Sequence, residues 1–328
     1  MAESRDVLDT VDTVDTVDTT DIPITLGDRM KQYEKAILPQ KIPSYQSFII
    51  RLDGCCFSKF TKPLKKPFDI MFTKAMCFTL QDLLKKFYAN TGYTHSDEIT
   101  LIFNKQESEL STHLYDGRTS KLLSVIAAYC SIRFNYHFHE IINDIQFDTF
   151  NLGSSDDNCK NDKSSDDERT FGFIDNMDKK CFEQIFDARI MILEPYEILN
   201  HQIWRSVIDC HRNAVSTYAD SVYSHETLHK KTTAEKIEML RSKNIIWESL
   251  PTFIKYGLYC KKILYETDVI NPNGEKVSRS RYEFKNFKIS FSEENINMLM
   301  SKYWDNEHDI YGESISIKSL KQKLILPQ

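Results

Sequence analysis

The order of β-forming runs and helical patterns between residues 47 and 222 constrains the fold more than any other feature of the sequence. Ser47–Leu52 (SFIIRL) is a short apolar run that ends at the turn signal Asp53-Gly54. Pro67 then precedes a helical pattern whose apolar residues recur on one face, and Asn90-Thr91-Gly92 ends it. This part of the chain therefore predicts a strand followed by a helix.

The next apolar runs continue the alternation. Tyr93–Phe103 (YTHSDEITLIF) predicts two short strands joined at the polar Ser96-Asp97-Glu98. We expect a long helix over Ser120–Glu140, a strand over Phe186–Leu193 and a helix over Tyr196–Val222. The order β-α-β-β-α-β is that of a ferredoxin-like layer, in which two helices pack on one sheet, and it is also the core of the polymerase palm. The expected fold class is α+β, with additional helices and a C-terminal β-hairpin.

Two acidic segments lie outside this pattern. Residues 1–28 repeat Asp-Thr-Val and carry eight acidic residues against one basic residue, which predicts a disordered tail. Residues 148–178 carry nine acidic residues against three basic ones and predict an exposed insertion in a palm catalytic domain over residues 29–257. Residues 258–328 are expected to pack on that domain as a helical extension with a hairpin at Asn273-Gly274, between Lys261–Ile270 and Lys276–Ser290.

Charge and composition limit the class of protein. The net charge is −6, but the two acidic segments carry more than this, so the rest of the chain is basic and compatible with RNA binding. The eight cysteines contain no CxxC pair, which argues against a structural zinc site. The sequence predicts no membrane span, and its start has neither the apolar core of a secretory signal nor the Arg-rich character of a transit peptide. We expect a cytoplasmic location, and nuclear entry is compatible with the same features.

The candidates for chemistry are two aspartates at strand ends. Asp53 closes the first strand, and Asp97 lies at the turn between the next two. Adjacent strands would bring both side chains to one sheet edge, where a palm holds the two Mg²⁺ ions that phosphoryl transfer needs. Judged from spacing alone, a metal site is the less frequent case. Acids at strand ends are common, so Asp53-Gly54 is more often an ordinary turn and Asp97 an ordinary loop residue.

Eight short sequence blocks are more specific evidence than the spacing of Asp53 and Asp97. They are RLDGCCFSKFTK at Arg51–Lys62, KPFD at Lys66–Asp69, SDE at Ser96–Glu98, FDAR at Phe186–Arg189, WR at Trp204-Arg205, DCHRN at Asp209–Asn213, EKIEML at Glu235–Leu240 and LPTFIKYG at Leu250–Gly257. In this order they resemble the tRNA-His guanylyltransferase family. The resemblance covers about Met30 to Gly257, apart from the acidic insertion.

The resemblance implies roles for individual residues. Two metal ions would be held by Asp53, the carbonyl group of Gly54 and Asp97. Glu98 is also important in the family, but its role is compatible with a structural one, because neighbouring residues in a strand point to opposite faces. The residues implied to line the nucleotide are Gly54, Phe57, Ser58, Lys66 and Ser96, with Arg118 and Lys121 as a basic pair for phosphates at a helix start. Those implied in 5′-end activation or RNA contact are His211, Asn213 and Lys236. Without the resemblance, the basic residues are more simply solvated charges and His211 a satisfied polar residue on a helix.

Three features depart from the family pattern. Cys55 stands where the family has Arg, and Ser58 stands where it has His; both family residues help to seat a nucleotide. The family's His-Ile-Asn-Asn-Leu-Tyr-Asn block reads HRNAVST at His211–Thr217. This changed block resembles the broader branch of tRNA-His guanylyltransferase-like proteins, which add nucleotides opposite a template strand and repair truncated 5′ ends.

The resemblance therefore implies a Mg²⁺-dependent 3′→5′ nucleotidyltransferase with two Mg²⁺ ions. Its substrates would be ATP, other NTPs and a tRNA or tRNA-like RNA. ATP would adenylylate a 5′-monophosphate end, and the 3′-OH of an incoming NTP would then attack the activated phosphate. Family members form tetramers, so a homo-oligomer is expected.

Two alternatives stay open. A nucleotide cyclase or diguanylate-type synthase shares the palm and its paired acids, although the blocks beyond the palm argue against it. A non-enzymatic RNA-binding homologue would explain Cys55 and Ser58, although the retained Asp53 and Asp97 argue against it.

Overall fold

The computed structural model describes residues 41–108, 110–153, 177, 180–305, 311–312 and 314–317, and for 145–153 it describes the backbone alone. The predicted acidic tail over 1–28 lies outside the described residues, as does most of the predicted insertion over 148–178. The described residues belong to one compact unit.

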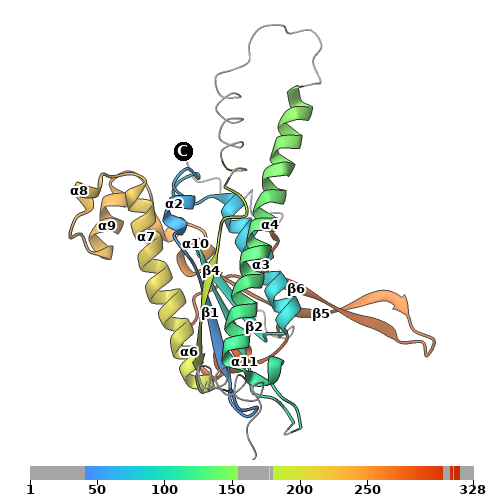
Figure 1. The fold of residues 1–328 in the computed structure, drawn as a ribbon. Coiled ribbons are helices and arrows are strands. Elements are labelled where there is room, and N and C mark those ends of the chain that lie inside the picture. Colours follow the sequence, from blue (N-terminus) through green and yellow to red (C-terminus); the bar gives the residue numbers. More distant parts are fainter. Residues whose placement is uncertain are drawn as a thin grey trace, which may run out of the picture. The chain divides into compact units, whose positions relative to one another are not determined.

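The βαββαβ core predicted from the sequence is confirmed (Figure 1). In the described residues, the sheet has the strand order β4-β1-β3-β2-β5-β6-β7, and all neighbouring strands are antiparallel. The core elements are β1 (Phe48–Gly54), α3 (Ile70–Phe87), β2 (Thr91–His95), β3 (Glu98–Phe103), α4 (Thr119–Gly153) and β4 (Phe186–Ile192).

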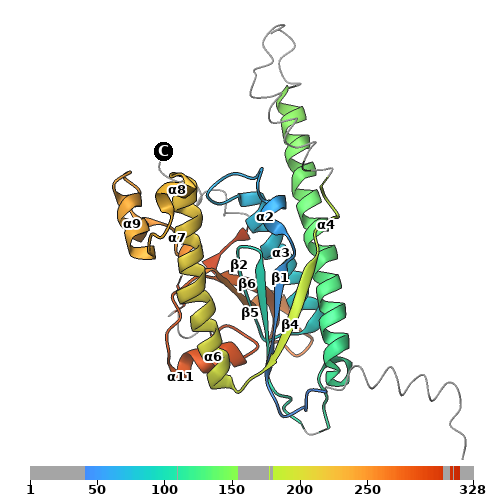
Figure 2. The same ribbon diagram turned by 60° about the vertical axis from the view of Figure 1, so that its left-hand side comes forward.

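The interior strand β1, between β4 and β3, is buried on both faces, which explains why its sequence is continuously apolar rather than alternating. Ile50 and Leu52 pack into the larger core under α3 and α4. Ile49 faces the other way and packs into a second core with Tyr259 and Leu299. Figures 1 and 2 show the sheet between the α3–α4 pair on one side and the continuous rod that contains α6 (Pro195–Ile203) and α7 (His211–Asp220) on the other.

The C-terminal hairpin predicted after residue 258 is joined to the palm by strand pairing. The first residues of β5 (Leu258–Ile270) pair with β2, so the hairpin continues the same sheet. Its second strand, β6 (Lys276–Lys285), is shorter than predicted, and the hairpin leaves the sheet as a two-stranded arm (Figure 1). The helix α11 (Glu293–Met300) contributes to the second core, and β7 (Ser314–Ile315) pairs with β6.

Two other expected elements differ from the structure. β1 extends to Gly54, so Asp53 lies in paired strand rather than in a turn. The helix expected over Tyr196–Val222 contains a π-helical segment, η2 (Trp204–Cys210), between α6 and α7. A π-helical turn re-aims side chains and is frequent at functional sites.

Shorter elements complete the described chain. They are α2 (Phe57–Phe60), η1 (Leu114–Gly117), α8 (His225–Leu228), α9 (Thr233–Arg241), η3 (Trp247–Ser249) and α10 (Thr252–Tyr256). None of the helices in the described ranges is long and apolar enough to cross a lipid bilayer.

Candidate active site

Three strands end side by side and bring three acidic side chains to one edge of the sheet. In the antiparallel register, Asp53 of β1 lies opposite Glu98 of β3 and opposite Asp187 of β4. Directly opposite residues point to the same face of a sheet, so the three carboxylates share a face. Glu98 contacts Arg205 of η2, which identifies this as the face that the π-helix covers.

The turn between β2 and β3 adds a fourth acid to this edge. Ser96 has a φ of 48°, a left-handed conformation that is uncommon for a residue other than glycine. Its Oγ lies 3.1 Å from a carboxylate oxygen of Asp97. The carbonyl oxygen of Asp97 accepts a hydrogen bond of 3.2 Å from the backbone N–H of Gly54, which ties the turn to the end of β1. Burial, together with the negative charge of Asp53, raises the pKa of the Asp97 carboxyl.

This group of oxygen atoms fits a divalent cation. A carboxylate that is destabilised by burial and by a neighbouring acid is stabilised when a cation binds between the two groups. One carboxylate oxygen of Asp187 is also buried here without a hydrogen-bond partner in the described part of the chain, which leaves acceptor capacity at the same edge. Asp53, Asp97 and the carbonyl group of Gly54 are the groups that would hold the ion.

Glu98, in contrast, is already engaged by two arginines. Arg51 donates to its carboxylate from Nη2 at 2.9 Å and from Nε at 3.3 Å, and Arg205 forms a second ion pair with it. The side chains of Glu98 and Arg205 are only 14% and 4% exposed. Arg205 also donates to Asp209 at 2.6 Å. Glu98 therefore joins β1, β3 and the π-helix through a buried ion-pair network.

A second group of potential metal ligands occurs in this network. Ligand atoms of His95, Glu98 and Asp209 lie within 4.8 Å of one another. Arg205 contacts both carboxylates, so a guanidinium already supplies the positive charge that a metal ion would bring. Burial and the charges of Arg205 and Arg51 lower the pKa of His95 to about 3, which keeps its ring neutral. Asp53 also contacts two arginines, Arg51 and Arg189, whereas the Asp97 carboxylate has no ion-pair partner among the described residues, so Asp97 is the acid here that a cation would stabilise most.

A cavity of about 220 Å³ lies beside the β2–β3 turn. Lys66, Ser96 and Asn213 contribute polar groups to its wall. Apolar walls with a few polar groups are typical of sites that bind small molecules. The apolar lining includes Leu64, Phe68, Phe72, Met76, Phe253, Ile254 and Leu258.

The segment after β1 is held by aromatic packing. Phe57 is buried among Phe60, Phe134 and Phe186, so its side chain supports α2 from the core and does not face a ligand. A Cβ atom added to Gly54 would lie 2.4 Å from the Phe57 ring, so glycine is required at this position. Ser58, the next residue of α2, is exposed.

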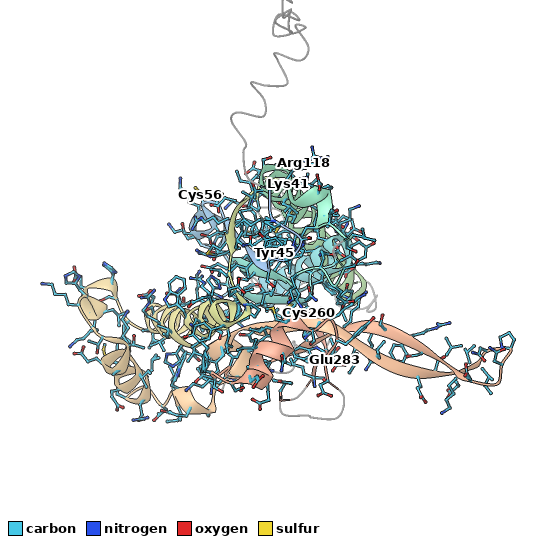
Figure 3. All side chains as sticks on the ribbon, turned by 90° about the horizontal axis from the view of Figure 1, so that it is seen from below. Lys41, Tyr45, Cys56, Arg118, Cys260 and Glu283 are labelled. Atoms are coloured by element: carbon cyan, nitrogen blue, oxygen red, sulfur yellow. The ribbon has the colours of Figure 1, made fainter. Side chains whose placement is uncertain are left out.

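Arg118 and Lys121 lie far from the acidic edge. Arg118 forms an isolated β-bridge with Lys41, and Figure 3 shows the two residues together. Farther along α4, Ser131 accepts a hydrogen bond from the first backbone N–H of β4, at the Asp53 end of the sheet. At about 1.5 Å of rise per residue, the helix between Arg118 and Ser131 spans roughly 20 Å. The predicted single nucleotide site therefore does not include Arg118 and Lys121 within one chain.

Two of the three residues implied in activation have other partners. His211 Nε2 accepts a hydrogen bond of 3.0 Å from the indole N–H of Trp247, and burial is the main cause that lowers its pKa. Lys236 Nζ donates to Ser216 Oγ at 3.1 Å and links α9 to α7. Asn213 is the member of the three that lines the cavity.

Sequence reasoning missed the importance of Asp187, Arg189 and Arg205. Arg189 lies 3.5 Å from Asp187 and 3.8 Å from Asp53, so it adds positive charge to the acidic edge. The FDAR and WR blocks contain all three residues, but the role of each depends on strand pairing and on the π-helix. An explicit prediction that β4 pairs antiparallel with β1 would have placed Asp187 opposite Asp53.

The sequence is similar to a known protein family and to a viral protein. Residues 27–194 match the family model described as tRNA-His guanylyltransferase (Thg1). An uncharacterised protein, R259, of Acanthamoeba polyphaga mimivirus is 37% identical over 290 residues, which cover 85% of this chain and 90% of that protein.

Solved structures show the same fold. A bacterial tRNA-His guanylyltransferase-like protein in complex with ATP is 25% identical, with a TM-score of 0.57 over 78% of this chain and 92% of that chain. The Saccharomyces cerevisiae tRNA-His guanylyltransferase is 20% identical, with a TM-score of 0.52 over 72% of this chain and 92% of that one, a likeness of fold alone. The match to the family model, the mimivirus relative and the shared palm together show that this chain belongs to the tRNA-His guanylyltransferase family of nucleotidyltransferases.

Proposed function

We propose that this protein is a Mg²⁺-dependent 3′→5′ nucleotidyltransferase that repairs 5′-truncated tRNA against a template strand. The observation that carries the proposal is the convergence of Asp53, Gly54 and Asp97 next to a cavity with Lys66 and Ser96 in its wall. A sheet edge with convergent acids beside a small-molecule cavity suits phosphoryl transfer, which needs positioning and charge neutralisation more than covalent catalysis.

The acidic residues would act by holding metal. Asp53 and Asp97 would hold two Mg²⁺ ions, which when bound lower the pKa of the attacking hydroxyl and neutralise charge on the phosphates. Arg51 and Arg189 keep the Asp53 side chain oriented toward this edge. Glu98 acts indirectly, because its two arginine partners fix the relative positions of β1 and the π-helix.

The cavity would accept the nucleotide. Its apolar walls suit a base, while Lys66 and Ser96, the latter hydrogen-bonded to Asp97, suit the phosphates. ATP and GTP are named as ligands of the bacterial relatives, which supports NTPs as ligands here.

The reaction would proceed in two steps at this site. In the first, a 5′-phosphate oxygen of the RNA attacks the α-phosphorus of ATP, forming an adenylylated end and releasing pyrophosphate. In the second, the 3′-OH of the incoming NTP attacks the 5′ phosphorus, the bond to AMP breaks, and the hydroxyl proton passes to solvent. An RNA that already has a 5′-triphosphate enters at the second step and releases pyrophosphate.

The cavity wall supports templated addition rather than addition of a single fixed G. Asn213, Ala214 and Thr217 line the cavity, and they belong to the block that departs from the family's tRNA-His pattern. Replacement of two family asparagines by Ala214 and Thr217 removes amide groups from this wall, so base selection would fall to pairing with the template strand. With tRNA as substrate, we propose a cytoplasmic location.

We also propose that the active form is a homo-oligomer, a tetramer as in the family. Arg118 and Lys121 lie at the other end of the sheet from Asp53, so a phosphate-binding role for them requires that a second copy present them to the site. Both side chains are exposed and accessible to such a partner.

A direct assay tests the proposal. A labelled tRNA transcript that lacks its first 5′ nucleotide is incubated with ATP, Mg²⁺ and all four NTPs, with Asp53→Asn as the matched inactive control. Extension that follows the base opposite the missing position is expected for the wild type alone. RNA binding without Mg²⁺-dependent extension would identify a binding homologue, and turnover of NTPs without RNA would identify a cyclase-type enzyme; either result overturns the proposal.

A further inference from the structure

A run of lysines without acidic neighbours follows the acidic edge. Residues 54–68 (GCCFSKFTKPLKKPF) contain four lysines and no acidic residue. We call Lys59, Lys62 and Lys65 the lysine rim; all three are exposed. Throughout the described ranges, none of their ammonium groups has an ion-pair or hydrogen-bond partner. A local cluster of uncompensated positive charge favours an anionic ligand.

The backbone that carries the rim is firmly held. Phe57, Phe60 and Leu64 are each at most 4% exposed and alternate with the lysines, so they anchor the segment in the core. The Asp69 carboxylate accepts a 3.0 Å hydrogen bond from the backbone N–H of Lys65, and it also caps α3. The segment is therefore a fixed platform from which the lysine side chains project.

The rim adjoins the site where the RNA 5′ end must lie. The cavity is lined by Thr61, Leu64, Lys65 and Lys66 of this segment. At the start of the same segment, the backbone N–H of Gly54 donates a hydrogen bond to the carbonyl oxygen of Asp97. Lys66 turns back within the segment, and its Nζ donates to the carbonyl oxygen of Thr61 at 3.2 Å. Lys59 and Lys62 are thus spread along the segment outside the cavity, while Lys65 lies where the segment meets the cavity wall.

We propose that the lysine rim binds the phosphodiester backbone of the RNA next to its 5′ end. The inference rests on the proposed function and adds the surface that receives the substrate. A single triphosphate in the cavity would be met by Lys66 and Ser96, whereas lysines spaced along an exposed segment suit a polymer of regularly spaced phosphates. Such contacts set orientation and affinity and carry no base preference.

The salt dependence of RNA binding tests the proposal. The variant Lys59→Ala/Lys62→Ala leaves the cavity-lining Lys65 in place, and Lys85→Ala/Lys86→Ala removes the same charge from the exposed C-terminal turn of α3. The affinity for the truncated tRNA transcript, measured without NTPs between about 50 and 300 mM salt, gives the slope of log affinity against log salt. Each lost phosphate contact lowers this slope by about 0.7 to 0.9.

We expect the rim variant to lose about 1.4 to 1.8 in slope and roughly ten- to a hundredfold in affinity near 0.1 M salt, equally for unrelated RNA sequences. The α3 variant should match the wild type, Lys59→Arg/Lys62→Arg should restore the slope, and ATP affinity measured without RNA should not change in any variant. A rim variant with the wild-type slope, or one that loses ATP affinity instead, overturns this proposal. If the wild type still extends the transcript in that case, the proposed function stands; a wild type that neither binds nor extends RNA overturns both.

Discussion

The different roles assigned to the neighbours Asp97 and Glu98 predict opposite effects of neutralising each residue. Among the described residues, the Glu98→Gln variant leaves Arg205 with Asp209 and Arg51 with Asp53 as acidic partners. Removing one member of a buried ion pair costs about 3–5 kcal/mol, because the remaining charge is left without a partner. Glutamine retains an acceptor oxygen and each arginine retains one carboxylate, so we expect a loss of about 2–3 kcal/mol.

The Asp97→Asn variant should not lower the stability of the protein. Burial and the charge of Asp53 disfavour the ionised Asp97 carboxyl in the folded protein, so its neutralisation should leave the metal-free protein as stable as the wild type, or more so. The same variant should lose Mg²⁺-dependent extension, because it removes a metal ligand.

Denaturant unfolding with and without Mg²⁺ separates the two effects. Glu98→Gln should unfold at lower denaturant and lower the melting temperature by roughly 5–10 °C, and it should still be stabilised by Mg²⁺. Wild type at about 100 times the Mg²⁺ dissociation constant should gain about 2.7 kcal/mol, and Asp97→Asn should gain almost nothing. The reasoning is refuted if Glu98→Gln lies within about 1 kcal/mol of the wild type, or if Asp97→Asn is the less stable of the two variants.

Three further predictions follow from other contacts. Gly54→Ala should disturb the packing of Phe57 and reduce extension more than tenfold, measured beside an unfolding curve; wild-type activity would show that the clash at 2.4 Å relaxes freely. Burial, aided by the charge of Arg51, lowers the pKa of His201 to about 4, so on acidification the unfolded chain is protonated at His201 before the folded protein is. The free energy of unfolding should therefore fall by at most about 3 kcal/mol from pH 6.5 to pH 4. His201→Gln should make the free energy of unfolding depend less on pH in this range. Mixing inactive Asp53→Asn with Arg118→Ala should restore part of the activity if a second copy supplies Arg118, and a mixture as inactive as its components would argue against shared sites.

The fold could be predicted because periodicity, turn signals and strand order agree. The run at Ser47–Leu52 and the double strand at Tyr93–Phe103 both match observed strands within two residues. The π-helix at Trp204–Cys210 could not be predicted, because its pattern of apolar residues is close to that of an α-helix. The position of Arg205 beside Glu98 depends on that segment.

The site was predictable only in part. The nearness of Asp53 and Asp97 follows from strand order, since adjacent strands share an edge. The separation of Arg118 from that edge does not follow from its motif, because it depends on the direction of α4 along the sheet. The partner of His211, the indole of Trp247, lies far along the chain and left no local signal.

The location of the metal ions decides between the two acidic groups of the site. Crystals of the protein grown with Mn²⁺ and a non-hydrolysable ATP analogue would show each ion as an anomalous peak. We predict peaks within about 2.2 Å of carboxylate oxygens of both Asp53 and Asp97, with the triphosphate beside Lys66. Peaks among His95, Glu98 and Asp209 instead, or carboxylates of Asp53 and Asp97 that share no ion, would contradict the proposed chemistry.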